Sequence, residues 1–407
     1  MMKCNLCKTG IVLSALTGLA LPTTALADFV ADGKVKLDLK NFYLTRSYDT
    51  AADDVGSWSQ AADLQYSSGY TDTRIQVGLD ASSQLAYIIS ADGDDGSVPI
   101  HADGEAPDTY GRSGATFKAK YSKTELTVGD HRPHLPIAWD DTSRQLDTIY
   151  EGAMLQSKEI DGLALTAGRY WEVVTRESSD KEGMSIFRGN DDKRSDGLDF
   201  LGASYDVTTA LNVTYFLGKL NDYYKQQYAG LTYKTRLGDV GSRTDVRLFR
   251  VSDDGEARNG EYDTQAFGLR ESLNMGNHTV MVNYQKMNND KFFPTLNGYI
   301  PQPYLVQWSN LAFVRPDEKS LGLVYMYNAK DTLPGLKIFA RMIKGTDIDV
   351  GGLTDENETE KNLYVTYSLQ QGSLKGLTFD VRGNFIDRSF TSGYDEYRVT
   401  TTYTVNF

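Results

Sequence analysis

The last eleven residues of the chain alternate between apolar and polar side chains. Read at a period of two, one face carries Val399, Thr401, Tyr403, Val405 and Phe407, and the opposite face carries only polar residues. Because successive side chains of a β-strand point to opposite faces, this pattern predicts a strand with lipid on one side and water on the other. A soluble edge strand is normally blunted by charge or proline, whereas this apolar face runs to the C-terminus. We therefore expect this strand to close a transmembrane barrel by pairing with the first strand.

The same alternation in other segments predicts which side chains face the lumen. In residues 35–40, 117–121 and 377–385, charged or polar residues alternate with apolar ones. A lysine or arginine that faces lipid at the bilayer midplane costs about 2–4 kcal/mol, so the charged members should point inward. The charged residues directed to the lumen in this way are Lys36, Asp38, Lys40, Lys118, Lys120, Asp380 and Arg382, and the polar face of the last strand adds Arg398.

Short polar or glycine-containing breaks mark the ends of the strands. Eight such turns are predicted, at residues 67–72, 121–125, 158–163, 205–211, 234–241, 275–278, 330–335 and 371–376. A membrane offers no partner for open sheet edges, so a spanning sheet must close on itself. With both termini at the periplasmic end, eight turns imply about 18 strands of the usual ~10 residues. The predicted fold is therefore all-β, a closed antiparallel transmembrane β-barrel.

The other breaks are longer and more polar, as the external loops of such barrels are. The clearest lie at residues 46–56, 91–114, 129–148, 175–196 and 290–302. Loops of this length in a compact domain usually carry function.

The first 27 residues have the features of a secretory signal peptide. Lys3 and Lys8 precede an apolar segment, and an Ala-x-Ala sequence at 25–27 precedes Asp28. We expect residues 1–27 to be removed and residues 28–407 to form a single outer-membrane β-barrel domain. Both cysteines, Cys4 and Cys7, fall within the removed segment, so the mature protein should contain no disulfide or cysteine metal site.

Composition agrees with a barrel rather than with a bundle of membrane helices. The mean hydropathy is −0.43, yet the chain contains 26 Tyr, 16 Phe and 37 Gly. A barrel reconciles these values because only every second strand residue must face lipid. The formal net charge of −13 argues against binding to nucleic acid.

Sequence motifs for catalysis or metal binding are missing. The chain contains no G-x-S-x-G, H-E-x-x-H or P-loop sequence. His131 and His134 are separated by Arg-Pro and are interpreted as loop residues rather than metal ligands. The acidic segment 92–96 lacks the glutamate of a calcium loop and is interpreted as an acidic external loop. We therefore expect no enzymatic activity, no metal and no cofactor.

The remaining candidate chemistry is a set of basic residues. Arg144 and Arg176, which lie in long loops, join the inward-facing Lys40, Lys118, Lys120, Arg382 and Arg398. One interpretation is a wet lumen with scattered charges, which any porin needs. The alternative is a basic track that draws an anionic solute through a constriction, since Arg and Lys line anion pores and Arg binds carboxylates with two hydrogen bonds.

Several segments, taken in order, resemble the OprD-type family of substrate-specific outer-membrane porins. They are KNFY at 40–43, LQYSSGY at 64–70, FKAKYSKTEL at 117–126, LP at 135–136, YEG at 150–152, EIDGL at 159–163, RESSD at 176–180, YAGL at 228–231, PYLV at 303–306 and LKGL at 374–377. The C-terminal strand ending in Phe407 is also similar to the signal by which Gram-negative outer-membrane proteins are recognised for assembly. The resemblance places the protein in the outer membrane of a Gram-negative bacterium.

The resemblance implies an 18-stranded barrel whose third loop, here about 129–148, folds inward to form a narrow eyelet. This loop carries Arg132, Asp140, Asp141 and Arg144. It also implies uptake of small carboxylates past a basic ladder opposite an electronegative pocket. In this chain Lys118, Lys120, Arg382 and Arg398 match ladder positions, and Arg144 and Arg176 match loop positions.

The chain departs from the family in its penultimate strand. Where the family often has Arg-x-Arg, this chain has Asp380-Val-Arg382. Asp380 either pairs with a neighbour such as Arg382 or weakens the anion selectivity, so a relative's substrate does not transfer directly.

The function predicted from these residues is a passive channel for small carboxylate-bearing nutrients, namely amino acids and aromatic or aliphatic acids. Arg144, Arg382 and Arg398 would hold the carboxylate. Lys118 and Lys120 would extend the track, and Asp140 or Asp141 would discriminate between solutes by repelling charge or pairing with an amine.

Two other functions are weighed against this one. A chitoporin-like channel for neutral oligosaccharides would need an aromatic track, for which Trp139, Trp171 and Trp308 are candidates. An outer-membrane enzyme would need a catalytic site that the sequence does not show. The expected partners are outer-membrane lipid, small anionic or zwitterionic solutes and the assembly machinery, and the barrel is expected to be a monomer or a loose trimer.

Overall fold

The structure, a computed structural model, describes residues 32–50, 52–187, 193–288, 291–296 and 302–407. The predicted signal peptide, 1–27, lies outside these residues. The described residues form twenty β-strands: β1 (Lys34–Tyr48), β2 (Val55–Ser67), β3 (Gln76–Asp92), β4 (Thr109–Tyr121), β5 (Thr124–His131), β6 (His134–Leu135), β7 (Ala138–Trp139), β8 (Ile149–Ser157), β9 (Leu163–Val174), β10 (Leu198–Asp206), β11 (Leu211–Leu220), β12 (Tyr224–Leu237), β13 (Val240–Asp253), β14 (Asp263–Met275), β15 (His278–Asn288), β16 (Lys319–Asn328), β17 (Leu336–Val350), β18 (Leu353–Ser368), β19 (Thr378–Arg388) and β20 (Tyr394–Asn406). Within this part of the chain, no helix is long and apolar enough to cross a membrane.

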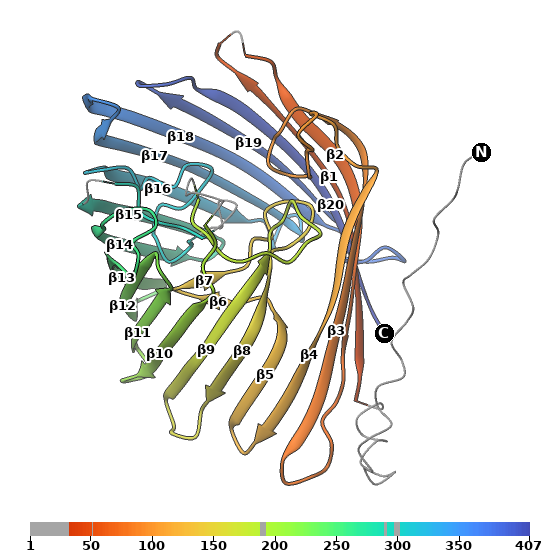
Figure 1. The fold of residues 1–407 in the computed structure, drawn as a ribbon. Coiled ribbons are helices and arrows are strands. Elements are labelled where there is room, and N and C mark those ends of the chain that lie inside the picture. The colour runs from red at the N-terminus through yellow and green to blue at the C-terminus, as the bar shows by residue number, and fades with distance from the viewer. Residues whose placement is uncertain (1–31, 51, 188–192, 289–290, 297–301) are drawn as a thin grey trace.

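Eighteen of the strands form one closed antiparallel sheet, which confirms the predicted fold. Each strand pairs with its neighbours along the chain, and β5 pairs with β8 because β6 and β7 lie inside the ring (Figure 1). The C-terminal strand closes the barrel as predicted, with β20 paired to β1 from Lys36↔Asn406 to Tyr48↔Tyr394. We call this β1–β20 junction the seam.

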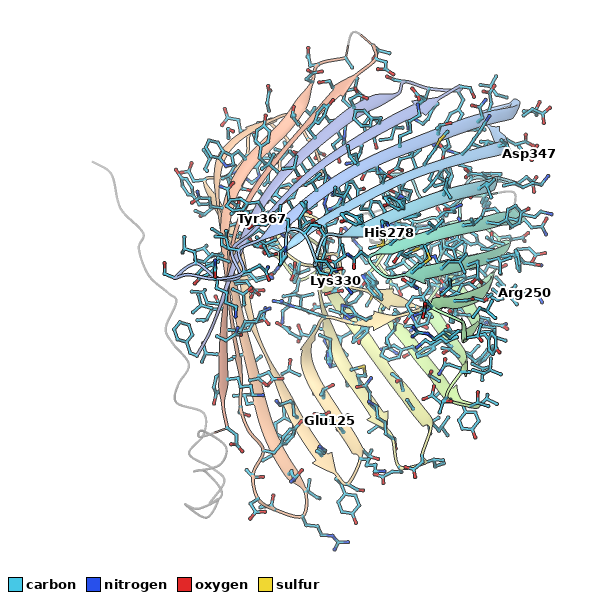
Figure 2. All side chains as sticks on the ribbon, turned by 180° about the vertical axis from the view of Figure 1, so that it is seen from behind. Glu125, Arg250, His278, Lys330, Asp347 and Tyr367 are labelled. Carbon is cyan, nitrogen blue, oxygen red and sulfur yellow. The ribbon has the colours of Figure 1, made fainter. Side chains whose placement is uncertain are left out.

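All eight predicted turns lie between consecutive strands at one end of the barrel, called here the short-turn end. The opposite end carries the long loops. In Figure 2 the labelled His278, Lys330 and Tyr367 mark the short-turn end, whereas Arg250 and Asp347 stand at the long-loop end. Two connections at the long-loop end differ from the expectation of long polar loops. Residues 221–223 and the pair Gly351–Gly352 form tight turns, the latter with positive φ at both glycines.

The loop between β15 and β16 is longer than the sequence predicts. The expected segment was 290–302, but β16 begins only at Lys319. The additional residues are largely apolar, and Leu305, Val306 and Phe313 are buried. These residues are apolar, as in a strand, because this part of the loop packs inside the barrel rather than in water.

Side-chain exposure confirms the predicted parity of the strands. Phe117 is 47% exposed on the outer surface, whereas the adjacent Lys118 is 7% exposed and faces inward. On β19 and β20, Val381 and Val399 face outward beside the inward-facing Arg382 and Arg398. The outer wall therefore presents apolar side chains to lipid, and the charges line the lumen.

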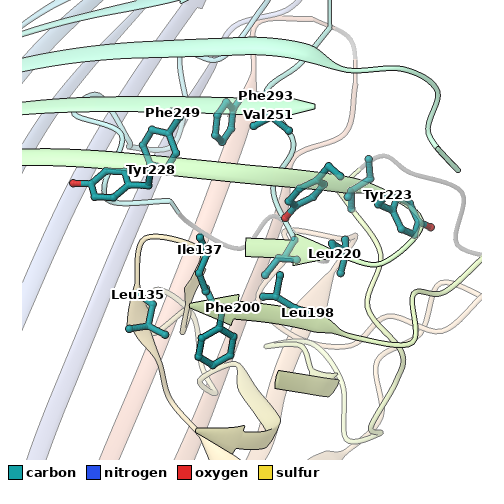
Figure 3. Packing of buried hydrophobic residues seen from close by; sticks show 14 of the residues in the cluster. Leu135, Ile137, Leu198, Phe200, Leu220, Tyr223, Tyr228, Phe249, Val251 and Phe293 are labelled. Carbon is teal, nitrogen blue, oxygen red and sulfur yellow. The ribbon is translucent and has the colours of Figure 1, made fainter. Parts of the chain in front are cut away.

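The loop between β5 and β8 folds into the barrel, as the resemblance predicted. Its tip forms the short hairpin β6–β7, with Leu135 paired to Ala138. This hairpin joins a large apolar core inside the barrel, between the loop and strands β8–β15 (Figure 3). Ile137 packs directly against Gly218 of β11, where an added Cβ would lie 2.9 Å from its side chain. The Pro136 carbonyl oxygen accepts hydrogen bonds from Gln226 (3.1 Å) and Gln302 (2.7 Å). The inserted loop therefore fills one side of the lumen and leaves the other side open.

Candidate pore constriction

The segment of the inserted loop just after the hairpin reaches the opposite wall. Asp141 is fully buried and accepts a hydrogen bond from Arg176 at 2.6 Å, which ties this segment to the loop between β9 and β10. The ammonium group of Lys40 on β1 donates to the Arg144 carbonyl oxygen. In return, Gln145 Nε2 donates to the Lys40 carbonyl oxygen at 3.3 Å. These contacts fix residues 141–145 against β1, beside the seam.

Two cavities meet at this segment. One, of about 530 Å³, lies toward the long-loop end between the inserted loop and the wall formed by β17–β20 and β1. The other, of about 300 Å³, lies toward the short-turn end and is lined by Lys40, Asp380 and several threonines. Ser143, Arg382 and Arg398 line both cavities. We call the position of these three residues the constriction, and the cavities the outer and inner cavities.

The outer cavity has arginines on both its wall and its loops, and its carboxylates are on its loops. The arginines are Arg46, Arg144, Arg176, Arg341, Arg382 and Arg398, and the acids are Asp94, Asp95, Asp141 and Glu177. Behind the arginines, Glu396 of β20 is fully buried and pairs with Arg46 (2.6 Å) and Arg398 (2.5 Å). The lining thus has a modest excess of positive charge, and most of its guanidinium groups already have a carboxylate partner.

Arg144 differs from these paired arginines. Arg144 is 8% exposed, and its guanidinium group donates to the carbonyl and hydroxyl oxygens of Ser143, both at 3.2 Å. Its Nε is buried without a hydrogen-bond partner, and no described carboxylate oxygen lies within 4.0 Å of its guanidinium group. Burial, together with Arg398 and Arg176, lowers the pKa of Arg144 to about 9. A positive charge destabilised in this way would be stabilised by an incoming anion.

Unlike the Arg144 guanidinium group, the carboxyl group of Asp141 is stabilised in its charged form by its surroundings. Burial by itself would raise the pKa of its carboxyl group, but the Arg176 and Arg144 guanidinium groups outweigh burial and lower that pKa. Asp141 is therefore held as an anion, and its bond to Arg176 is a fixed structural link of the loop. The sequence offered two adjacent aspartates as discriminating groups, and only Asp141 lines the outer cavity.

Asp140 points to the other side of the inserted loop. Its carboxylate pairs with His134 at 2.8 Å, and it lines neither cavity. Adjacent residues of an extended segment point in opposite directions, which accounts for the separation of Asp140 from Asp141.

The inner cavity contains the residue that departs from the family pattern. Asp380 accepts hydrogen bonds from Arg382 Nε at 2.5 Å and from Thr366 Oγ1 at 2.7 Å. Of the two expectations for Asp380, pairing with Arg382 is therefore observed. The Asp380 carboxylate thus neutralises the positive charge of Arg382 on the basic wall, on the short-turn side of the constriction.

The other predicted track residues lie away from the constriction. Lys118 pairs with Asp80 at 2.5 Å, and Lys120 lies near the ring of Tyr70 toward the short-turn end. Neither lines the outer or the inner cavity. Of the candidate residues, the structure brings together Lys40, Asp141, Arg144, Arg176, Arg382 and Arg398.

Some cavity residues were not predicted. Arg341 alternates between the outward-facing Ala340 and Met342, so the period-two rule could have found it. Asp94 and Asp95 had been interpreted as part of an acidic external loop, yet that loop folds back and lines the outer cavity. Asn310 comes from the loop between β15 and β16, and no local signal in the sequence indicates that it enters the lumen; Trp308 of the same loop, named as a candidate for an aromatic track, also lines the outer cavity.

Comparison with known proteins identifies relatives of this architecture. The sequence profile described as outer membrane porin, OprD family, matches residues 27–407. Porin D of Pseudomonas aeruginosa is 30% identical over 384 residues, which cover 87% of this chain and 86% of Porin D.

Solved structures show the same similarity in three dimensions. The crystal structure of Pseudomonas aeruginosa OpdK with vanillate superposes with a TM-score of 0.89 at 31% identity and covers 93% of this chain and 100% of OpdK. Pseudomonas aeruginosa OpdL superposes with a TM-score of 0.84 at 36% identity and covers 93% of this chain and 100% of OpdL.

Proposed function

The chain belongs to the OprD family of outer-membrane porins, and from this premise we propose that its constriction selects small solutes that carry a carboxylate. Membership establishes a channel in the outer membrane of a Gram-negative bacterium, with a barrel that faces lipid and a lumen through which small solutes pass; it is not an enzyme. The solute class is our proposal. We include amino acids and aromatic or aliphatic acids in this class.

The observation that carries the proposal is the unpaired guanidinium group of Arg144. It lies beside Arg382 and Arg398, which line both cavities, so a solute crossing the constriction must pass all three groups. A carboxylate can accept two parallel hydrogen bonds from one guanidinium group, and such charge-assisted bonds are roughly twice as strong as neutral ones. Arg144 is therefore the group with which a solute carboxylate can pair without first displacing a protein carboxylate.

The remaining cavity residues fit a small solute with an additional polar group. Asp94 lines the outer cavity together with the arginines, where it can receive an ammonium group or repel a second carboxylate, and Asp141 adds a negative charge there while it stays bonded to Arg176. Lys40 continues the basic wall into the inner cavity. OpdK has been crystallised with vanillate, an aromatic carboxylate, and this supports a similar solute class here.

A channel for neutral oligosaccharides receives less support. Of the three candidate tryptophans, only Trp308 lines the outer cavity, and none lines the inner cavity. A sugar chain would need a continuous run of aromatic faces, whereas the constriction offers charged groups.

The domain organisation, the assembly and the oligomeric state of the barrel are also proposals. We propose that residues 28–407 act as one domain after removal of 1–27, and that the β20 strand ending at Phe407 is recognised by the assembly machinery. The barrel would act as a monomer or a loose trimer.

The proposal is tested by recording single channels in planar bilayers with benzoate as the probe. Arg144→Gln should raise the benzoate concentration needed for half-block by tenfold or more, because one charged hydrogen-bond partner contributes about 1.5–3 kcal/mol. Arg74→Gln, in the turn between β2 and β3, removes the same charge from an exposed site and should change nothing. A pore that prefers cations, ignores benzoate and is blocked by oligosaccharide would contradict the proposal.

A further inference from the structure

A third cavity lies on the other side of the inserted loop. It encloses about 300 Å³ and is lined by Trp139, Tyr228, Tyr304, Arg243, Arg247 and smaller residues. It shares no lining residue with the outer or the inner cavity. It is therefore separate from the path through the constriction, and we call it the side niche.

The side niche lies between the apolar core inside the barrel and the short-turn end. Above it, Ile137 and Phe249 belong to the apolar core that fills this side of the lumen. Below it, Thr232 and Arg243 approach the short turn between β12 and β13. Because the apolar core lies on the side of the long loops, we expect a solute to reach the niche from the short-turn end.

Three aromatic side chains shape the niche. The Trp139 and Tyr304 rings meet edge to face with centroids 5.9 Å apart, and the Tyr228 and Tyr304 rings do so at 5.2 Å. His134 stacks on the Trp139 ring at 4.4 Å. The rings are held by contacts with one another, so they offer a preformed apolar surface to a flat solute.

The polar side of the niche carries two arginines with one carboxylate between them. Arg243 and Arg247 both pair with Asp245, at 2.9 Å and 3.1 Å. Asp245 is 2% exposed and also accepts a hydrogen bond from Thr232 at 2.6 Å. Two positive charges facing one negative charge leave one positive charge in excess.

Arg247 is fixed in position and incompletely satisfied. It donates to the Tyr228 hydroxyl at 2.9 Å, and its guanidinium carbon lies 5.1 Å from the centre of the Tyr304 ring. Its Nε is buried and has no hydrogen-bond partner among the described residues. Gly230 allows this arrangement, because a Cβ at that position would lie 2.3 Å from the Tyr228 hydroxyl. An unsatisfied buried donor beside excess positive charge is the environment in which an anionic acceptor binds.

We propose that the side niche is a second solute site, which binds a compact aromatic carboxylate from the periplasmic side. The ring lies against Trp139 and Tyr304, and the carboxylate lies against Arg243 and Arg247. This site retains solute beside the exit of the pore, and it does not depend on the selectivity of the constriction.

Fluorescence of a single tryptophan can test this site. In a variant with Trp58, Trp171 and Trp308 replaced by Phe, Trp139 is the remaining tryptophan of the chain's four. The full barrel in detergent is titrated with 4-nitrobenzoate, whose electron-poor nitroaromatic ring quenches tryptophan emission on contact by accepting an electron from the excited indole. We expect saturable quenching that benzoate reverses, and much weaker competition by benzamide, which has the same ring without the charge.

Matched arginine variants locate the binding charge. Arg243→Gln should weaken binding roughly tenfold or more, as expected for loss of one charged partner. Arg236→Gln removes the same charge from an exposed site on β12 that does not line the niche, and Arg144→Gln alters the constriction; both should leave binding unchanged. Unsaturable quenching, equal competition by benzamide, or an equal effect of Arg236→Gln and Arg243→Gln would overturn the proposal.

Discussion

The clearest electrostatic prediction concerns Asp380, where the sequence departs from the pattern expected of the family. Its carboxylate lies 2.5 Å from Arg382 Nε in the inner cavity, next to the constriction. Asp380→Asn removes the negative charge but keeps a side-chain oxygen that can accept from Arg382 and Thr366. The substitution therefore changes the charge of the lumen with little change in its shape.

The size of the effect follows from Coulomb's law. An anion bound at Arg382 would lie about 6 Å from the Asp380 carboxylate, where two unit charges repel by about 0.7 kcal/mol in water and about 2.8 kcal/mol at an effective dielectric constant of about 20. The inner cavity is partly wet, because the Arg382 side chain is 39% exposed and that of Asp380 is 15% exposed. We therefore expect Asp380→Asn to lower the free energy of an anion bound at Arg382 by about 1–2 kcal/mol, which raises the occupancy of that position by a factor of about 5–30.

Reversal potentials across a potassium chloride gradient measure this change directly. Asp380→Asn should shift the reversal potential toward that of chloride and lower the benzoate concentration for half-block by the same factor. The shift should be larger at low ionic strength, because salt screens charges over about 10 Å at 0.1 M. Asp161→Asn removes the same charge from a 97% exposed side chain in the turn between β8 and β9 and should have no effect. An unchanged reversal potential in Asp380→Asn, or a shift toward potassium, would refute the reasoning.

Two further predictions concern the inserted loop. Arg176 and Arg144 lower the pKa of Asp141, so its ion pair stabilises the inserted loop fully above the ordinary aspartate pKa of 3.8. This stabilisation is lost only as the pH falls through the lowered pKa. The noise of the open-channel current should therefore be constant from pH 7 down to about pH 4.5. Asp141→Asn should raise that noise at every pH, since breaking a buried pair costs about 3–5 kcal/mol, and quiet currents in this variant would contradict the assigned link. Gly218→Val should push Ile137 away from β11 at a cost of about 1–3 kcal/mol. Circular dichroism should therefore show a lower melting temperature than for Gly241→Val, where an added Cβ would meet nothing closer than 3.9 Å, and proteolysis within the inserted loop checks that the hairpin is displaced.

The strands could be predicted from the sequence because the membrane imposes a local rule. Every second residue of β4, β19 and β20 faces lipid, and these positions are mostly apolar. The apolar neighbours of Lys118, Arg382 and Arg398 therefore predict that these three side chains face the lumen. The turns could be predicted for the same reason, since alternation stops where lipid stops. Fold and strand number therefore follow from patterns a few residues long.

The site could be predicted only in part because it depends on contacts between distant segments. Arg144 meets Lys40 across 104 positions of the chain, and Arg398 meets Asn310 across 88. The apolar residues after position 302 indicate burial but not that the buried segment is a loop within the lumen. Likewise, the acidic residues Asp94 and Asp95 face the pore only because their loop folds back, which no periodicity records.

The attachment of the inserted loop to the seam has a consequence for assembly. Residues 144 and 145 bond to Lys40 on the first strand of the barrel, and Arg398 beside them belongs to the last. Both walls of the narrowest point are thus brought together only when the two ends of the chain have paired. A partly assembled barrel that is still open at this junction would have strands and loops but not the proposed constriction. We therefore expect the channel to become selective only once the sheet is complete.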